Sequence, residues 1–336
     1  MGEPLRIAVA GLGSMGANHV RVLSDLPDVE LVGVMDVDPS RVQRVTARRT
    51  FPGFDDLRRM LEETRPQALV VAVPTRAHAE VAREALRRGV HVLVEKPIAA
   101  SVPEARELER EAAQRGLVLS VGHVERFNPA VAELRRRLAA GEGGRVFQLH
   151  ARRIGPFPQR IRDVGVVLDL ATHDVDVCRF LLGEDVERVY AAVQRRIHTE
   201  NEDLCVGMLH FRSGTVALIE TNWLTPVKER SLRVLCERGM YVVDYLAQTL
   251  TFYENHAAVA RDGSPVSVTE GPMVRYPIPF KEPLRAELEA FRDAVRIGDP
   301  APVPASDAIA ALEITEALVA SASSGEPKTL ATVSAG

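Results

Sequence analysis

Short apolar runs alternate with amphipathic segments in the amino-terminal part of the chain. The runs have the length and composition of buried strands and lie at residues 5–10, 30–35, 68–73, 91–94 and 117–121. Segments such as 76–88 and 101–115 carry apolar residues at helical spacing instead. Because strands that alternate with helices form parallel sheets covered on both faces, this pattern predicts a doubly wound α/β domain at residues 1–124.

The pattern changes in the remainder of the chain. A helix predicted at 129–140 ends at the glycine-rich break 141–144. Strand-like runs joined by turns then follow one another directly, at 186–196, 205–211, 216–222, 231–236 and 240–244. This succession predicts a mainly antiparallel sheet, and two final helices at 284–297 and 306–323 complete an α+β domain at 125–336.

A glycine-rich loop directly follows the first apolar run. It reads Gly11-Leu12-Gly13-Ser14-Met15-Gly16 and opens a predicted helix. Glycine is needed in such a loop for a tight turn, for backbone approach to a pyrophosphate and for helix packing, and the free amides of the helix start bind the phosphates. Asp36 ends the next strand, about 20 residues after the loop, where an acidic residue binds the ribose hydroxyls. Since Asp36 would repel a 2′-phosphate, we expect NAD rather than NADP, although Arg41 leaves NADP open.

A second motif, Glu95-Lys96-Pro97, ends the fourth apolar run. Open α/β sheets bind ligands at the carboxyl ends of their strands, and Pro97 keeps Lys96 out of the helical region, so the chain turns there. Lys96 is one of four lysines among 42 lysines and arginines. An ordinary surface cation in this chain would therefore be arginine, which favours a functional Lys96 over an exposed lysine at a strand end.

A third candidate cluster lies in residues 165–183, whose apolar positions have helical spacing and which end at a possible C-cap, Gly183. If the helix begins near Asp169, then Asp169 and His173 lie at i and i+4 on one face. The carboxylate would orient the imidazole, and the helix start would keep His173 neutral as a base. Alternatively, Asp169 caps the helix and His173 is a buried structural group. A zinc site with Asp176 is disfavoured because no Cys/His ligand set accompanies it, so we expect no metal.

The whole chain resembles the Gfo/Idh/MocA family of NAD(P)-dependent sugar and cyclitol oxidoreductases. The similar segments are GLGSMG at 11–16, Asp36, VAVPTRAH at 71–78, VEKP at 94–97, GHVERFNP at 122–129, LDLATHDVD at 168–176 and EPLRAELEAF at 282–291. The resemblance implies a Rossmann domain followed by an open-faced sheet domain through which homodimers or homotetramers form.

The resemblance also implies roles for individual residues. Lys96, Asp169 and His173 would form the catalytic group, with family members differing over whether the lysine or the histidine takes the proton. Contacts to the cofactor are implied for the loop residues Gly11, Gly13, Ser14, Met15 and Gly16, and for Asp36, Pro74, Thr75, His78, Glu95 and Lys96. Thr75 departs from the asparagine of many relatives, which leaves its contact in question.

The chemistry of these residue types agrees with alcohol oxidation, which needs a base for the hydroxyl proton and positive charge beside the developing alkoxide while NAD takes the hydride. The segments at 122–129 and 168–176 resemble most the branch that oxidises C3 of UDP-N-acetylglucosamine or related UDP-sugars. In that interpretation the sugar meets Lys96, Asp169 and His173 together with Arg126 and Asn128, and Arg152 or Arg153 meets the diphosphate. Alternatives are an inositol or free-sugar dehydrogenase, a redox-assisted glycosidase, and a non-catalytic sugar sensor.

Composition excludes other classes of partner. The net charge of −4 argues against nucleic acid as a partner. Three cysteines, Cys178, Cys205 and Cys236, are widely spaced and lack CxxC pairing, which is typical of reduced thiols in a cytoplasm. No apolar run is long enough to span a membrane, and the chain enters its first strand without room for a signal peptide. We therefore expect a cytoplasmic enzyme with a small-molecule substrate.

Overall fold

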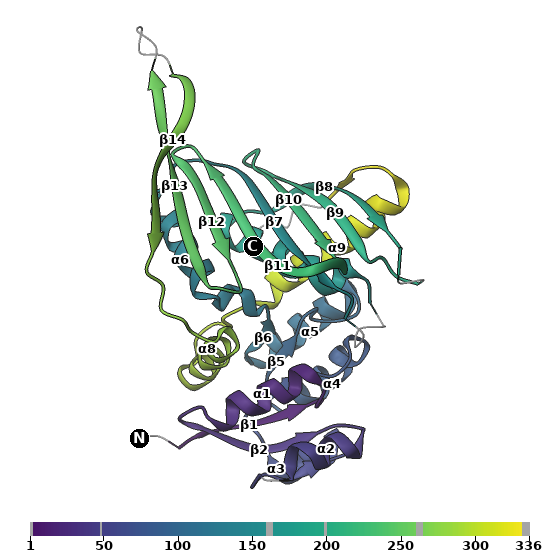
Figure 1. Ribbon diagram of the computed structural model, residues 1–336. Coiled ribbons are helices and arrows are strands. Elements are labelled where there is room, and N and C mark those ends of the chain that lie inside the picture. Colours follow the sequence, from purple (N-terminus) through teal and green to yellow (C-terminus); the bar gives the residue numbers. More distant parts are fainter. Residues whose placement is uncertain (1–2, 48, 159–163, 198–199, 260–264, 331–336) are drawn as a thin grey trace. The chain divides into compact units, whose positions relative to one another are not determined.

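The computed structural model describes residues 3–47, 49–158, 164–197, 200–259 and 265–330 (Figure 1). The chain divides into two compact units, the first formed by residues 1–124 and 282–312 and the second by residues 125–281 and 313–336. The sequence pattern predicts one domain after residue 124, whereas the segment 282–312 belongs to the first unit.

In the part of the chain that the structure describes, the first unit contains one six-stranded sheet with the order β3-β2-β1-β4-β5-β6. All neighbouring strands are parallel. They are β1 (Leu5–Ala10), β2 (Val29–Met35), β3 (Gly53–Phe54), β4 (Ala68–Val71), β5 (His91–Glu95) and β6 (Leu119–Gly122). The chain starts at the centre of the sheet and reverses its direction of travel after β3, as in doubly wound dinucleotide-binding domains, so the predicted α/β fold is confirmed.

Helices cover both faces of this sheet (Figure 1). They are α1 (Ser14–Ser24), α2 (Pro39–Thr46), α3 (Leu57–Thr64), α4 (His78–Arg87), α5 (Val102–Arg115) and α8 (Pro283–Ile297), with a 3-10 turn η1 (Thr75–Ala77) before α4. Ile7 and Val9 of β1 and Leu93 of β5 are fully buried. Strands buried on both faces read as continuous apolar runs, which is why the sequence pattern predicts them.

Helix α8 explains why the segment 282–312 belongs to the first unit. Leu288 and Phe291 of α8 are fully buried in the same core as Val20 and Leu23 of α1. Burial of two large apolar side chains contributes about 3–6 kcal/mol. Ahead of the helix, Glu282 forms an ion pair with Arg21 of α1.

The second unit is built on a mixed, mainly antiparallel sheet. Within the described ranges it has nine strands in the order β14-β13-β12-β11-β7-β10-β9-β8-β15, of which β7 and β10 form the parallel pair. The strands are β7 (Val146–Pro156), β8 (Val186–Gln194), β9 (Leu204–Phe211), β10 (Val216–Asn222), β11 (Leu224–Cys236), β12 (Gly239–Asp244), β13 (Thr249–Val259), β14 (Pro265–Tyr276) and β15 (Lys328–Thr329).

Helices pack against one face of this sheet. They are α6 (Pro129–Ala139), α7 (Thr172–Leu182) and the end of α9 (Ala305–Ser324), and the short helical turns η2 (Val124–Phe127) and η3 (Val167–Ala171) precede α6 and α7. Strand residues that point toward the helices are buried, and alternate residues, as in β9, are partly exposed. We call the side opposite the helices the open face. The predicted α+β architecture with an open-faced sheet is confirmed.

No described helix is long and apolar enough to cross a membrane. The cysteines Cys178, Cys205 and Cys236 are buried free thiols, and burial raises the pKa of Cys205 and of Cys236 to about 12. These thiols are therefore unreactive at neutral pH. The expected cytoplasmic location stays a prediction.

Candidate active site

The glycine-rich loop connects β1 to α1, and two of its glycines are required by sterics. Gly11 has φ +88°, and a Cβ there would lie 2.4 Å from the carbonyl oxygen of Ala72. A Cβ on Gly16 would lie 1.8 Å from the carbonyl oxygen of Gly11. At Gly13, by contrast, a Cβ would meet no described atom within 4 Å.

This arrangement leaves the start of α1 accessible to an anion. Gly13 is the N-cap of α1 and, as a glycine, has no side chain that could accept a hydrogen bond from the amides of the first turn. The free amides of the first turn, at the positive end of the helix, therefore face the open space beside Gly13. A pyrophosphate binds such a helix start through these amides.

Asp36, at the end of β2, joins the strand to the loop. It is 4% exposed, and its Oδ2 accepts a hydrogen bond of 2.6 Å from the amide of Leu12 while Oδ1 accepts one of 2.9 Å from the amide of Asp38. Nη1 of Arg41 lies 3.4 Å from Oδ2. A carboxylate has about four acceptor positions, so Asp36 retains capacity for ribose hydroxyls.

A hollow of about 300 Å³ lies beside the loop and is lined by Leu12, Gly13, Ser14, Ala17, Arg41, Arg44 and Val45. Val37, directly after Asp36, is 82% exposed and offers an apolar surface next to the Asp36 carboxylate. Sequence reasoning missed both Val37 and Arg44, because a single exposed valine and one arginine among many carry no pattern.

The loop after β4 contains the predicted cofactor contacts Pro74, Thr75 and His78. Pro74 is exposed and Thr75 partly exposed. His78 is 2% exposed, with Nδ1 2.8 Å from the carbonyl oxygen of Pro97 and Nε2 2.9 Å from that of Val73. Burial lowers the pKa of His78, although these carbonyl contacts act in the opposite direction. The ring is therefore occupied by backbone carbonyls on both sides.

Glu95 and Lys96 follow at the end of β5. Oε1 of Glu95 lies 2.8 Å from Nε2 of His19, a fully buried residue of α1. Burial would raise the pKa of Glu95, but the hydrogen bond with His19 and the nearby positive charges, including Lys96, lower it below its usual range. Glu95 is thus a buried carboxylate directly before Lys96, whose peptide bond to Pro97 is cis.

Asp169 and His173 lie in one continuous helical segment of the second unit. Asp169 is in the π-helical turn η3, three residues after its N-cap Val166, and His173 is in the first turn of α7. Asp169 is therefore not the N-cap of this segment. Both side chains are partly exposed, whereas their neighbours Asp174 and Asp176 are buried. π-Helical turns inside helices are frequent at functional sites.

The buried carboxylates of α7 hold two of the predicted substrate arginines. Arg126, 7% exposed, forms a bidentate pair with Asp176, with Nε–Oδ2 2.8 Å and Nη2–Oδ1 2.5 Å. Arg153, 1% exposed, contacts both oxygens of Asp174 at 3.0 Å, and its Nη1 lies 2.9 Å from Oε1 of Glu125. Burial, with a smaller contribution from the charge of Glu125, raises the pKa of Asp174 despite the opposing charge and hydrogen bonds of Arg153. Both guanidinium groups thus anchor α7 and η2.

Asn128 and Arg152 are also engaged inside their unit. Asn128 caps α6 by accepting a hydrogen bond of 3.1 Å from the amide of Ala130, and its Nδ2 donates to the carbonyl oxygen of Tyr245 at 3.1 Å. Arg152 points to the open face, opposite to Arg153, where it forms ion pairs of 2.9 Å with Glu220 and with Glu229. The structure does not bring Arg152 to the helix that carries Asp169 and His173.

Arg230 is a candidate that sequence reasoning missed. It pairs in register with Arg153 on the helix-covered side of the sheet, and its side chain is 32% exposed. Its nearest ion-pair partner among the described residues is Glu125, at 3.9 Å. Burial and then the charge of Arg153 lower the pKa of Arg230, while Asp169 is among the carboxylates that oppose this shift. Arg230 is therefore a partly exposed cation on the helix-covered side of the sheet.

The first unit brings the glycine loop, Asp36, the residues 74–78 and the pair Glu95 and Lys96 to the carboxyl edge of one parallel sheet. Asp169, His173 and Arg230 belong to the second unit. Among the described side chains, no group of three or more His, Cys, Asp or Glu residues has the arrangement of a metal site.

Comparisons with known proteins identify the family. The family described as "Oxidoreductase family, NAD-binding Rossmann fold" matches residues 5–123, and the "GFO/IDH/MocA C-terminal domain" matches residues 131–242. The chain belongs to the Gfo/Idh/MocA family. It is therefore an oxidoreductase with an NAD-binding Rossmann domain, from a family of sugar and inositol dehydrogenases.

Two relatives of this Gfo/Idh/MocA oxidoreductase are named for different substrates. The UDP-N-acetylglucosamine 3-dehydrogenase of Acidithiobacillus ferrooxidans is 32% identical over 87% of this chain and 88% of its own length. The scyllo-inositol 2-dehydrogenase (NAD+) of Bacillus subtilis is 26% identical over 97% of this chain and 96% of its own.

Two solved structures are also similar to this chain. The UDP-N-acetylglucosamine 3-dehydrogenase GnnA from A. ferrooxidans superposes with a TM-score of 0.85 and 28% identity, covering 96% of this chain and 99% of its own. GenD2 from gentamicin A biosynthesis, solved in complex with NAD, has a TM-score of 0.83 and 27% identity, covering 99% and 98%.

The residues of this oxidoreductase fit NAD. The open space at Gly13, the start of α1 and the carboxylate of Asp36 would hold the pyrophosphate and the ribose on adjacent elements. The contacts to the cofactor expected for Gly11, Gly13, Ser14, Met15, Gly16, Asp36, Pro74, Thr75, His78, Glu95 and Lys96 all stay predictions.

Proposed function

We propose that this oxidoreductase oxidises a secondary alcohol of a UDP-sugar, at C3 of UDP-N-acetylglucosamine or a related sugar. The observation that carries the proposal is the 32% identity to a UDP-N-acetylglucosamine 3-dehydrogenase over 87% of the chain. The segments GHVERFNP and LDLATHDVD, which resemble the same branch, also support it.

Three residues carry the proposed chemistry. Bound NAD supplies the hydride acceptor. His173, partly exposed at the start of α7, takes the hydroxyl proton, and the ammonium group of Lys96 stabilises the negative charge that develops on the oxygen. Asp169 lies four residues before His173 and orients its ring.

Recognition of the sugar in this proposal involves Arg230 rather than the arginines already engaged with carboxylates. Arg126 and Arg153 each hold a buried aspartate, and withdrawing either would leave that charge unpaired in the interior. Arg230 has no such close partner among the described residues and is partly exposed on the helix-covered side of the sheet. Its guanidinium can donate to sugar hydroxyls or to a diphosphate oxygen.

A second candidate function is the oxidation of inositol or another neutral polyol. The full-length similarity to scyllo-inositol 2-dehydrogenase favours it. The internal ion pairs of Arg126, Arg152 and Arg153 favour it as well, because they leave fewer cations for a diphosphate.

A substrate panel tests the proposal. We expect NADH formation with UDP-N-acetylglucosamine at a much lower KM than with free N-acetylglucosamine, because the nucleotide provides binding energy remote from the reacting carbon. Higher kcat/KM with myo-inositol or a free hexose than with every UDP-sugar would replace this substrate by the polyol. Glycosidic cleavage without net NADH would indicate a redox-assisted glycosidase, and binding without turnover a sensor.

Substitutions test the catalytic assignment. Lys96→Met and His173→Ala are each expected to lower kcat by about 100-fold, the usual value of a general base or of oxyanion-type stabilisation. The Kd for NAD should change little. His256→Ala, at an exposed histidine of β13, is the control and should leave kcat unchanged. Near-normal kcat in the Lys96 or His173 variant would indicate that this residue has a structural rather than a catalytic role.

We also propose that the enzyme is cytoplasmic and forms homodimers or homotetramers through the open face of the nine-stranded sheet. Several large apolar side chains on this face are substantially exposed, including Tyr190, Val206 and Leu235. Burying such a surface against a second copy would remove it from water.

A further inference from the structure

Two buried histidines contact the residues on either side of Lys96. His19, from the middle of α1, lies against the side chain of Glu95, the residue before Lys96. His78, the first residue of α4, lies against the carbonyl oxygen of Pro97, the residue after it. The histidines come from different helices, and both contacts are 2.8 Å long. They therefore hold the Glu95-Lys96-Pro97 turn from both sides.

The first contact links the turn to the phosphate-binding helix. His19 is fully buried, and its Nδ1 has no hydrogen-bond partner among the described residues. The neutral tautomer with its proton on Nε2 donates to Glu95 and leaves no buried N–H unpaired. Glu95 in turn stands beside Gly122 of β6, where a Cβ would lie 3.0 Å from Oε2. The carboxylate is therefore enclosed, with little freedom to move.

The second contact links the turn to the glycine loop. The His78 ring also lies 2.9 Å from the carbonyl oxygen of Val73. Val73 follows Ala72, the residue whose carbonyl oxygen packs against Gly11. One imidazole thus spans the exit of β4 and the exit of β5. The neutral ring has one N–H, so it donates to one of these carbonyl oxygens and packs against the other, which restricts the position of Pro97 relative to the cofactor loop.

Neither histidine is placed to act on a ligand directly. His19 is 0% and His78 2% exposed, whereas Asp169 and His173 are partly exposed. The lysine side chain between them has four rotatable bonds, so the position of its ammonium group depends on how firmly its backbone is held. A displacement of about 1 Å in a reacting group can cost about 100-fold in rate.

We propose that His19 and His78 are positioning residues that fix the direction of Lys96, acting through the Glu95 carboxylate and the Pro97 carbonyl. The inference rests on the proposed catalytic role of Lys96. It adds that helix α1 and the exit of β4 are both linked by contacts to the turn that carries the catalytic lysine.

Kinetics of matched variants test the inference. His19→Leu removes the donor to Glu95, whereas His19→Gln retains an amide N–H near the position of Nε2. We expect kcat to fall about 10- to 100-fold in His19→Leu and to recover largely in His19→Gln, with the Kd for NAD changed less than about threefold. His91→Leu is the control. His91 lies on β5, the strand that precedes the turn, and accepts a hydrogen bond of 3.0 Å from the amide of Val118, but it does not contact the turn. Its kcat should remain normal.

A spectroscopic measurement makes the test independent of turnover. The chain has four lysines, so reductive ¹³C-methylation of the holoenzyme gives few signals, and Lys96→Arg identifies that of Lys96. In the wild type this signal should be separate from those of the other lysines. In His19→Leu and His78→Leu the chemical shift of the Lys96 signal should move toward those of the other lysines, and in His91→Leu it should be unchanged.

The outcomes separate the inference from the proposed function. An unmoved Lys96 signal in both histidine variants would overturn the inference, as would equal losses of kcat, NAD affinity and thermal stability in His19→Leu and His91→Leu. Normal kcat in Lys96→Met would instead refute the catalytic role of Lys96, while the signal still reports on positioning. If His19→Leu does not fold, His19→Asn, whose amide falls short of Glu95, replaces it with the same expected results.

Discussion

Asp36 and Arg41 are expected to have opposite effects on cofactor choice. The carboxylate of Asp36 repels a 2′-phosphate, while Arg41, 3.4 Å away, and Arg44 line the hollow beside the loop and would attract one. Asp36 also accepts the amide hydrogen bond of Leu12, so its charge is held at a fixed position. We therefore expect the preference for NAD to depend on a single carboxylate, that of Asp36, which lies beside Arg41.

We expect Asp36→Ser to narrow the preference for NAD over NADP by about tenfold, the value of one charge-assisted hydrogen bond of about 1.5 kcal/mol. The released Arg41 would donate to the 2′-phosphate. Calorimetric titration with both cofactors measures the change. Adding Arg41→Ala to Asp36→Ser should abolish the gain in NADP affinity. If Asp36→Ser alone leaves the affinity for NADP unchanged, Arg41 does not reach the phosphate.

At the residue scale, a role can be predicted from the sequence when the residues that determine it are close together along the chain. Gly11, Gly16 and Asp36 are predicted because the loop, its helix and the next strand are consecutive, and their spacing is fixed by the fold. Arg126 is different, because its partner Asp176 lies 50 residues further along the chain. The sequence alone does not distinguish an arginine that binds a substrate from one that pairs with a distant buried carboxylate.

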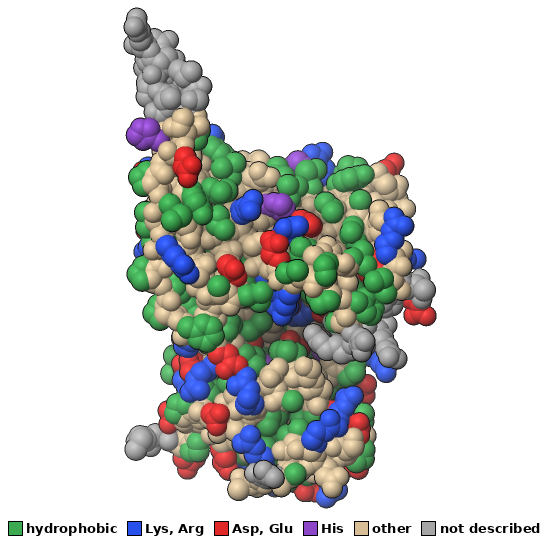
Figure 2. Space-filling view, in the orientation of Figure 1, with side chains coloured by type: hydrophobic (Ala, Val, Ile, Leu, Met, Phe, Trp, Pro, Cys, Tyr) green, Lys and Arg blue, Asp and Glu red, His purple; other side chains and the backbone are tan. Residues whose placement is uncertain are grey.

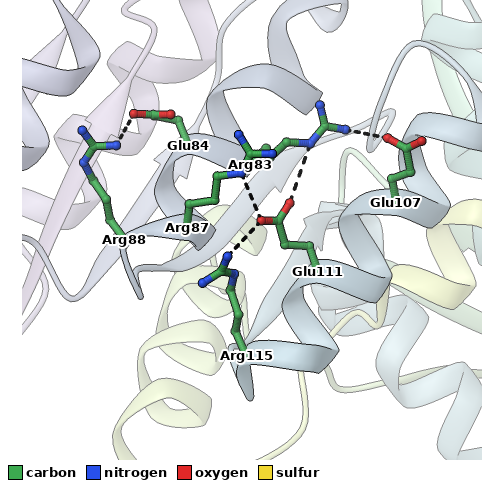
Figure 3. Close-up of polar contacts among 7 residues, drawn as sticks. All are labelled: Arg83, Glu84, Arg87, Arg88, Glu107, Glu111 and Arg115. Carbon is green, nitrogen blue, oxygen red and sulfur yellow. Dashed lines mark hydrogen bonds and ion pairs between the residues drawn. The ribbon is translucent and has the colours of Figure 1, made fainter.

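Helices α4 and α5 are joined by a network of ion pairs centred on Glu111 (Figure 3). Its carboxylate, 18% exposed, lies 3.7 Å from Arg83, 3.3 Å from Arg87 and 3.3 Å from Arg115. Glu107, by contrast, pairs with Arg83 alone and is 56% exposed. Because one carboxylate serves three guanidinium groups, its loss would leave three like charges facing one another.

We expect Glu111→Gln to lower the free energy of unfolding by about 1 kcal/mol at low salt, at the upper end of the range for partly exposed pairs. The effect should shrink as salt screens the arginines. Urea unfolding at low and high ionic strength measures both. Glu107→Gln is the matched control and should have a smaller effect, and equal effects of the two substitutions would show that the network adds nothing beyond single pairs.

Strands were predictable where both faces are buried, as in the parallel sheet, and where buried and exposed positions alternate, as in β9 and β10. They were missed where neither pattern is clear. β1 and β5 are continuous apolar runs. β7 contains adjacent Arg152 and Arg153, which point to opposite sides of the sheet, and this pair hides the strand pattern. β14 is exposed along its described side chains and has no apolar face that a pattern could reveal.

At the scale of the whole chain, the two units differ in how many faces of their sheet are covered by helices. The parallel sheet is covered by helices on both faces, whereas the nine-stranded sheet has an open face (Figure 1). Figure 2 shows apolar side chains on the visible face of this sheet around a small central group of charged ones. On the open face Tyr190 is 41%, Val206 49% and Leu235 40% exposed.

An interface through this face predicts a specific effect of one substitution. In a two-fold dimer the same patch is used by both copies, so Val206→Asp would introduce two carboxylates into one apolar contact. A stable interface requires about 800 Å² from each partner, which a nine-stranded sheet can supply. We expect the wild type to sediment at a multiple of its 36.8 kDa chain mass and Val206→Asp to shift toward the monomer. Ile297→Asp, which replaces a 70% exposed apolar residue of α8, is the control and should leave the assembly intact. A monomeric wild type, or equal dissociation of both variants, would remove the open face as the interface.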